Sequence, residues 1–448
     1  MGTPSPSAVS TKLQRIAELA RQSPQMAMTT LGHHIDIEFL HEAYRLTRKG
    51  GAVGVDGRTA ESYADDLEAN LQGLLDRFNS GTYQAPPVRR LHIPKGDGRQ
   101  TRPIGIPTFE DKILQRAVTM ILAAIYEQDF LDCSYGFRPG RSAHMALAAF
   151  WQTSMATGGG WVLEVDIRKF FDHLDHGHLR GFLDDRVRDG VLRRTIDKWL
   201  KAGVLEDGCV SHSDAGTPQG GVISPLLANI YLHEVVDTWF ERQIKPRLAG
   251  RATLIRYADD MVMVFTCERD AQRVMAVLPK RLARFGLSLH PQKTRLLDFR
   301  RPPSKSSPTG RNSRLRSGTF DLLGFTHYWG LSRRGNWVVY RKTARDRFSR
   351  ALKDLNLWCR RHRHEPIVWQ HAQLAAKLRG HCAYYGITGN SRRLWTYRFH
   401  LLRIWRRWLS RRSQRGRVSW EAFDRLLVRL PVLTAVAVHS RLTHAANP

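Results

Sequence analysis

The stretch Leu254-Ile-Arg-Tyr-Ala-Asp-Asp-Met-Val-Met-Val-Phe265 decides how the fold of this chain is interpreted. It holds two short apolar runs separated by Tyr257-Ala-Asp-Asp260, a pattern that predicts a β-hairpin with the acidic pair at its turn. Adjacent carboxylates repel each other and cost stability unless a cation lies between them. An Asp-Asp pair inside an apolar hairpin therefore favours a metal site over an ordinary turn.

A second acidic strand end lies upstream. Trp161-Val-Leu-Glu-Val-Asp-Ile167 predicts a strand with Asp166 at its end, and taken alone Asp166 is better explained as a cap or turn residue. Together with the Asp-Asp hairpin, Asp166 predicts a site that binds divalent cations. Nucleotidyl transfer uses two divalent cations about 3.5–4 Å apart, and such hard cations require oxygen ligands that converge at strand ends or turns.

The charge of the chain predicts a polyanionic partner. Its 448 residues include 70 Lys and Arg against 41 Asp and Glu, a net charge of +29. Such an excess attracts nucleic acid or an acidic membrane surface. No apolar run approaches the roughly 18–20 residues that span a bilayer, so we expect nucleic acid and no membrane. Five scattered cysteines without a C-x-x-C pair argue against a disulfide framework or a zinc site and indicate a reducing compartment. The polar N-terminus has no secretion signal, so we expect a cytoplasmic protein.

Elsewhere the sequence predicts a mixture of strands and helices. Two strands, at 88–95 and 102–106, are expected on either side of a Gly96-Asp-Gly98 turn. Helical segments are expected at 35–77, with a Gly-rich interruption at 50–57, and at 112–130 and 224–240. A linker rich in Pro, Ser and Arg follows at 300–318.

The C-terminal region is helical, aromatic and strongly basic. Residues 341–417 hold 21 Lys and Arg but only three acidic residues, a net +18, which predicts a separate basic domain. On a helix from Leu394 to Leu409, an apolar face and an arginine face are predicted. The apolar face holds Leu394, Tyr397, Leu401, Trp405 and Trp408, and the opposite face holds Arg403, Arg406 and Arg407. We expect the arginines to contact phosphates, although a solvated basic helix without a ligand remains possible.

In chain order, a series of motifs resembles those of the reverse transcriptases encoded by bacterial group II introns, which also act as maturases. The motifs are Gly54-Val-Asp-Gly57, Ile93-Pro-Lys95 with Arg102-Pro-Ile-Gly-Ile-Pro107, Ser134-Tyr-Gly-Phe-Arg-Pro139, Val165-Asp-Ile-Arg-Lys-Phe-Phe-Asp172, Gly216-Thr-Pro-Gln-Gly-Gly-Val-Ile-Ser-Pro-Leu-Leu-Ala-Asn229, Tyr257-Ala-Asp-Asp260, Gly286-Leu-Ser-Leu-His-Pro-Gln-Lys-Thr294 and Leu322-Leu-Gly-Phe325. Two later stretches, 378–390 and 411–414 followed by 420–423, resemble the maturase region.

The resemblance implies an α+β right-hand polymerase with an α-helical thumb. An N-terminal lead-in would cover 1–30, fingers and palm 31–335, and the thumb or maturase domain 336–448. Many relatives carry a further zinc-bearing His-Asn-His endonuclease domain with paired cysteines. This chain has no such cysteines, so we expect a form that lacks this domain and does not cleave DNA.

Site residues are also implied by the resemblance. Asp166 and Asp259 would be the principal ligands of two Mg²⁺ ions, with Mn²⁺ as a substitute, and Asp260 would complete the catalytic acidic set; Ile167 joins the metal-binding set. Lys293 would stand near the leaving pyrophosphate as a general acid.

The nucleotide-binding set implied by the resemblance is Lys95, Arg102, Ile167, Phe171 and Gln219. Lys95 and Arg102 would hold the triphosphate, although such cations are usually solvated. Phe171 would exclude a ribose 2′-hydroxyl, with plain core packing as the alternative. Gln219 would pack against the incoming nucleotide. Leu322–Phe325 would grip the primer end or form a buried strand.

The expected function is RNA-directed DNA synthesis. The partners would be an RNA template with a DNA primer, deoxynucleoside triphosphates and the group II intron RNA whose splicing the protein assists, near the bacterial nucleoid; the oligomeric state stays open. Two alternatives remain: an RNA chaperone with an idle polymerase site, and a reverse transcriptase adopted for host repair or defence. The intact acidic set argues against the first, because binding alone does not require it.

Overall fold

The structure is a computed structural model that describes residues 6–95, 100–206, 209–211, 220–303, 318–413 and 416–432. It divides into two compact units. The first unit holds residues 1–153 and 160–297, and the second holds residues 154–159 and 298–448. The domain boundaries expected from the sequence remain predictions.

A four-stranded sheet organises the first unit. Its order is β6 (Ala252–Tyr257), β7 (Asp260–Phe265), β3 (Trp161–Val165) and β8 (Arg295–Asp298). β7 is antiparallel to both of its neighbours. The apolar runs on either side of the acidic pair thus form the predicted hairpin, and five of the six β7 residues are buried.

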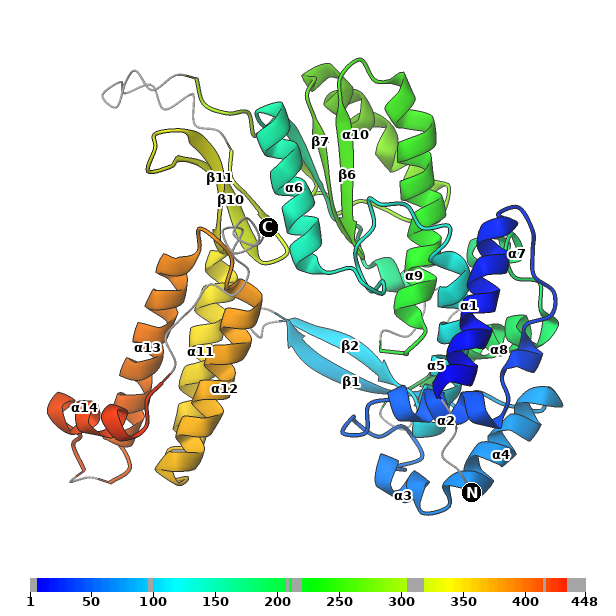
Figure 1. Ribbon diagram of the computed structural model, residues 1–448, viewed down its shortest axis with the longest axis horizontal. Helices are drawn as coiled ribbons and strands as arrows, with labels where there is room; N and C mark the ends of the chain where they lie inside the picture. Colours follow the sequence, from blue (N-terminus) through cyan, green and yellow to red (C-terminus); the bar gives the residue numbers. More distant parts are fainter. Residues whose placement is uncertain are drawn as a thin grey trace. The chain divides into compact units, whose positions relative to one another are not determined.

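Helices pack against one face of this sheet. α9 (Ser224–Leu232) has Pro225 in its first turn, and it continues through π-helical turns at His233–Asp237 and Trp239–Ile244. This confirms the helix predicted for 224–240. α10 (Glu268–Ala283) contacts β3 and β7, and Figure 1 draws it in green beside β6 and β7.

A second sheet of the first unit has the order β2-β1-β4-β5. β1 (Val88–Lys95) and β2 (Gln100–Ile106) are antiparallel, as predicted, and the connecting turn lies outside the described residues. β1 is also parallel to β4 (Val204–Glu206), which pairs with β5 (Cys209–Ser211). Ile93 and Arg102 are cross-strand partners near the far end of the β1–β2 ribbon.

The other helices of the first unit enclose its apolar core. They are α1 (Pro6–Gln22), α2 (Ile37–Leu46), α3 (Ala60–Ala64), α4 (Leu67–Asn79), α5 (Phe109–Tyr126), α6 (Ala143–Thr157), α7 (His176–Asp184) and α8 (Gly190–Lys201). α6 also extends into the second unit. α5 begins three residues before the predicted start, because the Thr108 side chain accepts a hydrogen bond from the Asp111 N–H and caps the helix there.

The second unit combines a small sheet with four helices. The sheet has the order β11-β10-β9, with β9 (Phe320–Leu322), β10 (Phe325–Leu331) and β11 (Trp337–Thr343). The helices are α11 (Arg345–Arg361), α12 (Ile367–Tyr385), α13 (Ser391–Leu409) and α14 (Trp420–Arg429), the first three drawn alongside one another in Figure 1. All five residues of the predicted apolar face of α13 are buried in the core of this unit.

Candidate active site

Asp166, Asp260 and Tyr257 form one row across the sheet. Tyr257 is directly opposite Asp260 in the β6–β7 hairpin. The β3–β7 ladder ends at the pair Val165 and Met261, and the same register carried one position further would bring Asp166 opposite Asp260. Directly opposed residues of an antiparallel pair share a face, and successive residues alternate faces. The row therefore lies on the face opposite to Val165 and Met261, which are buried in the helix-covered core.

The buried side chain of Arg256 holds the backbone of the acidic turn, residues 257–260, in place. This residue is fully buried, and its guanidinium donates to both carboxylate oxygens of Asp237, at 2.7 and 2.5 Å. It also donates to Asn229 Oδ1 at 2.9 Å, to Ser134 Oγ at 2.8 Å and to the Ala258 carbonyl at 3.1 Å. Ala258 has a φ of +56°, a left-handed conformation that is uncommon outside glycine and requires support from surrounding structure. The buried arginine supplies that support next to Asp259.

Gly136 packs against the backbone of the same turn at Ala258. A Cβ atom at position 136 would lie 2.3 Å from the Ala258 nitrogen, so only glycine fits. The Gly136 carbonyl accepts a hydrogen bond from Asn229 Nδ2 at 2.7 Å. The same Asn229 side chain therefore joins this loop to Arg256 and to the acidic turn.

Lys293 lies beside Asp166, although 127 positions separate them in the chain. Its Nζ is 3.0 Å from Asp166 Oδ2, and both side chains are partly exposed. The backbone brings them together, since the His290 N–H donates to the Asp166 carbonyl at 2.8 Å and Ile167 bridges to Leu289. The site thus places an ammonium against the carboxylate that directly follows β3.

The carboxylates of the row, together with the neighbouring Asp259, suit a hard divalent cation. Asp166, Asp259 and Asp260 offer carboxylate oxygens from neighbouring backbone positions, and each is at least partly accessible to solvent. Among the described residues, no group of three or more His, Cys, Asp or Glu side chains is already arranged around a common point. Mg²⁺ rarely needs such a cage, because it usually combines one or two carboxylates with water and substrate phosphates. Ile167 has a hydrocarbon side chain without a donor atom, so it could contribute only its carbonyl oxygen.

Phe171 follows Asp166 by five residues, in a short 3₁₀ turn (Phe170–Asp172). Its ring is half-buried, and its centroid is 5.2 Å from that of Phe170. Phe170 is 2% exposed and belongs to the core, whereas Phe171 is only partly buried against the same core. Phe171 retains an accessible surface that a nucleotide sugar could contact.

The other nucleotide-binding residues expected from the sequence lie on or near the β1–β2 ribbon. Arg102 is exposed on β2. Lys95 ends β1 opposite Gln100, and the structure describes only its backbone. Gln219 lies outside the described residues. Their proposed contacts with a triphosphate remain predictions.

The glycines that follow Gln219 are described, and they pack tightly. Gly220 has a φ of +120°, and a Cβ there would lie 2.5 Å from the Gly105 carbonyl oxygen of β2. The buried Gln115 side chain accepts hydrogen bonds from the N–H groups of Val222, at 2.8 Å, and Ile223, at 3.4 Å. The segment after Gln219 is therefore anchored to both β2 and α5.

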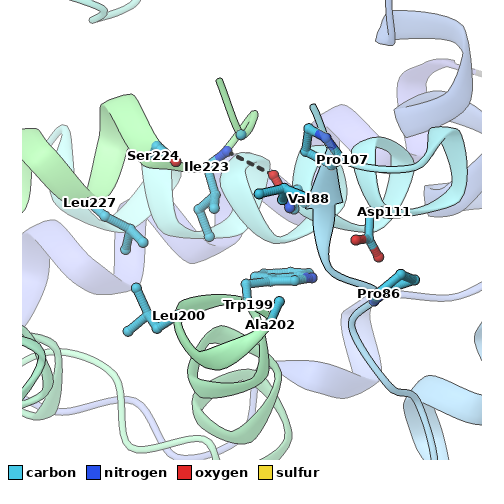
Figure 2. A pocket seen from close by; sticks show the side chains of 12 residues that line it. Pro86, Val88, Pro107, Asp111, Trp199, Leu200, Ala202, Ile223, Ser224 and Leu227 are labelled. Carbon is cyan, nitrogen blue, oxygen red and sulfur yellow. Dashed lines mark hydrogen bonds between the residues drawn. The ribbon is translucent and has the colours of Figure 1, made fainter. Parts of the chain in front are cut away.

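A largely apolar pocket lies next to the segment that follows Gln219 (Figure 2). Trp199 and Leu200 of α8 and Leu227 of α9 line it, together with Asp111 of α5. Burial raises the pKa of Asp111 to about 7, although the Tyr83 hydroxyl, which donates to its carboxylate, opposes the shift. The sequence did not single out Asp111, because a carboxylate in the first turn of a helix is ordinary.

On α13 the three predicted arginines fall into two groups. Arg403 and Arg407 are exposed, as expected. Arg406 is half-buried, donates to the Val418 carbonyl at 2.8 Å and has its guanidinium carbon 3.8 Å from the ring centroid of Trp420. The expectation of a solvent-facing Arg406 was wrong, because the segment that leads into α14 covers it.

Two exposed aromatic residues share the surface with Arg403 and were missed by the sequence analysis. Trp395 is 57% exposed and Phe399 is 52% exposed. They precede Arg403 at helical spacing, and its guanidinium carbon is 5.4 Å from the Phe399 ring centroid. The sequence pattern that could have predicted this surface is the alternation of aromatic residues and arginines along one face of the helix.

None of the described helices is both long and apolar enough to cross a membrane. The sequence profile of the reverse transcriptase (RNA-dependent DNA polymerase) family matches residues 93–327, just over half of the chain. The group II intron-encoded protein LtrA of Lactococcus lactis subsp. cremoris is 38% identical over 227 residues, which are 50% of this chain and 37% of LtrA. Protein YkfC of Escherichia coli (strain K12) is 36% identical over 290 residues, 57% of this chain and 75% of YkfC.

A longer but weaker similarity extends further along the chain. The 91 kDa protein in the cob intron of Schizosaccharomyces pombe is 26% identical over 393 residues. That alignment covers 74% of this chain and 47% of the fission yeast protein. The chain thus spans less than half the length of this relative and of LtrA.

Proposed function

Because this chain belongs to the reverse transcriptase (RNA-dependent DNA polymerase) family, we propose that it copies an RNA template into DNA at the row formed by Asp166, Asp260 and Tyr257. The observation that carries this proposal is the register of β3, β6 and β7, which aligns carboxylates from two distant segments on one face. Lys293 adds a cation at the same place. An RNA-binding protein without polymerase activity has no need of this arrangement.

Reverse transcriptases generally use divalent metal ions, and we assign Mg²⁺, with Mn²⁺ as a substitute, to Asp166, Asp259 and Asp260. When bound, the two ions activate the attacking hydroxyl and neutralise the triphosphate. The primer 3′-hydroxyl oxygen forms a bond to the α-phosphorus of the incoming nucleotide, the bond to pyrophosphate breaks, and the hydroxyl proton is lost. We assign to Lys293 the neutralisation or protonation of the departing pyrophosphate, and its Nζ, 3.0 Å from Asp166 Oδ2, supports this assignment.

The nucleotide would lie on the β3 side of the row. Phe171 follows Asp166 there and has an accessible ring, so it is our candidate for excluding a ribose 2′-hydroxyl. Arg102 would contact the triphosphate from the β1–β2 ribbon, together with Lys95, and Gln219 would pack against the nucleotide. In this assignment the first unit supplies fingers and palm, and the helices of the second unit supply the thumb.

We assign RNA binding to α13 of the second unit. Arg403 and Arg407 are exposed on its surface, and the exposed Trp395 and Phe399 precede them at helical spacing. Arginines bind phosphates, and exposed aromatic rings stack on unpaired bases, so this face suits a structured RNA with single-stranded loops. The relatives named above include an intron-encoded protein, which favours group II intron RNA over a host repair or defence substrate.

Primer extension tests the enzymatic proposal. The purified full chain is incubated with a DNA primer annealed to an RNA template, deoxynucleoside triphosphates and Mg²⁺. We expect extension that EDTA abolishes and that excess Mg²⁺ restores. Absence of extension in Mg²⁺ and in Mn²⁺, by protein that still binds the annealed primer, would contradict the proposed function.

A further inference from the structure

The loop Ser134–Pro139 exposes an aromatic residue that the assignments above leave unused. Phe137 is 60% exposed, although it is a large apolar side chain. Its φ is +56°, in the left-handed region that bulky residues rarely adopt. An exposed ring held in a strained backbone conformation indicates a contact with something outside the chain, because folding alone gains little from it.

The loop that carries Phe137 is rigidly supported. The next residue, Arg138, is buried, and it donates to the carbonyls of Leu131 and Ser134 at 2.8 and 2.9 Å. It also forms an ion pair with Glu127, with 3.0 Å between Arg138 Nη2 and Glu127 Oε2. These bonds explain how the strained conformation persists, since they fix the backbone on the C-terminal side of Phe137.

Phe137 is placed against the acidic hairpin. The preceding Gly136 packs on Ala258 so closely that no side chain fits between them. The Phe137 ring centroid is 6.2 Å from that of Tyr257. Tyr257 is in turn directly opposite Asp260. Phe137 therefore extends the row beyond β6, on the side away from β3 and Phe171.

We propose that the rings of Phe137 and Tyr257 support the terminal base pair of the primer–template duplex. The inference rests on the proposed function. Bond formation at the carboxylates requires the primer end and the incoming nucleotide on opposite sides of them. The nucleotide is assigned to the β3 side, which leaves the β6 side, with its two adjacent rings, for the duplex end. Aromatic rings contact bases and sugars without sequence preference, as a polymerase requires.

The test compares Phe137→Gly with Phe137→Tyr. Glycine removes the ring and also relieves the left-handed strain, so the melting temperature should stay equal or rise. We expect the glycine variant to bind a short primer–template roughly tenfold more weakly, with faster dissociation, because one stacking platform is lost. Its KM for deoxynucleotides, measured at saturating primer–template, should stay within about twofold of the parent. The tyrosine variant, which keeps the ring, should bind like the parent.

Three results would overturn the inference. They are unchanged primer–template affinity in the glycine variant, weak binding by the tyrosine variant, and an effect confined to the KM for deoxynucleotides. All three are measured against a parent protein that extends primers, so failure of the parent to extend would refute the proposed function instead.

Discussion

Arg256 and Asp237 form a fully buried ion pair directly beneath the acidic turn, with both carboxylate oxygens bonded, at 2.7 and 2.5 Å. Removing one partner leaves the other charged and buried, which costs about 3–5 kcal/mol. We therefore expect Asp237→Leu and Arg256→Met each to lower the free energy of unfolding by that amount in urea titrations. The double variant should be clearly more stable than the sum of the single effects predicts.

An exposed ion pair provides the control for this cycle. Arg300 and Asp298 are paired at 2.6 Å with side chains 60% and 41% exposed. Asp298→Asn should change the free energy of unfolding by less than about 1 kcal/mol. Additive single effects at Arg256 and Asp237 would show that the two charges do not depend on each other. Because Arg256 also holds the Ala258 carbonyl, primer extension by the double variant should remain impaired even where stability recovers.

Asp259→Ala should abolish primer extension on an RNA template and leave RNA affinity within a few-fold of the parent. The carboxylate lies in the hairpin turn and contributes to cation binding in our assignment, whereas RNA binding is assigned to the other unit. Asp65→Ala is the matched control, because Asp65 is an exposed aspartate of the same unit away from the row. Near-normal extension by the Asp259 variant would contradict the polymerase assignment.

Phe171→Ala should relax discrimination against ribonucleotides, because it removes the accessible ring proposed to exclude the 2′-hydroxyl. The adjacent Phe170 gives a sharp comparison. It is 2% exposed, so Phe170→Ala should cost about 3–5 kcal/mol of stability without changing sugar choice. The measurement is the ratio of kcat/KM for deoxy- and ribonucleotides. An unchanged ratio in the Phe171 variant would mean that this ring only packs against the core.

The pKa of Asp111 predicts a specific pH dependence of stability. Burial raises it to about 7 in the folded protein, against about 3.9 in an unfolded chain. The folded state therefore favours the neutral carboxyl, and that stabilisation is present below about pH 4 and is lost as the pH rises through about 7. Asp111→Asn stays neutral and should not show this loss.

The difference in unfolding free energy between the parent and Asp111→Asn should accordingly fall between about pH 4 and pH 7, by at most about 1.4 kcal/mol per pH unit, and stay flat above. Urea titrations of both proteins at a series of pH values measure it. Parallel curves across that range would show that Asp111 ionises freely.

Local pattern predicted the elements that depend on a single segment. Alternation around the Asp-Asp pair predicted the β6–β7 hairpin, and helical spacing predicted the buried face of α13, from Leu394 to Trp408. The partner of Arg256 could not be predicted this way. Asp237 lies 19 residues upstream in a helical segment, and no local pattern links a helix residue to a particular residue of a later strand.

Contacts between distant segments required either the resemblance or the structure. Spacing alone does not place Lys293 beside Asp166, 127 positions away. Helical periodicity assigned Arg406 to the polar face of α13 but could not show that Trp420 covers it. Phe137 appeared in a motif without a role, and only its exposure and left-handed φ distinguish it from a core phenylalanine.

The arginines of α13 should separate into one that stabilises the helix packing and two that bind RNA. Arg406 bonds to Val418 and lies over Trp420, so Arg406→Ala should lower stability by about 1–2 kcal/mol. Arg403 and Arg407 are exposed, and each phosphate contact releases about one counterion. The double variant Arg403→Ala/Arg407→Ala should therefore bind structured intron RNA more weakly, with a log–log salt slope shallower by up to about two.

Filter binding across a salt series measures both the affinity and the slope. Arg403→Lys/Arg407→Lys is the matched control, because it keeps the charge and should keep most of the slope. Extension of a short homopolymer primer should suffer less than intron binding in the alanine variant, since the acidic row is untouched. Equal slopes and affinities for the parent and the alanine variant would show that Arg403 and Arg407 are solvated and do not contact RNA. The RNA would then have to bind at other basic residues of the second unit.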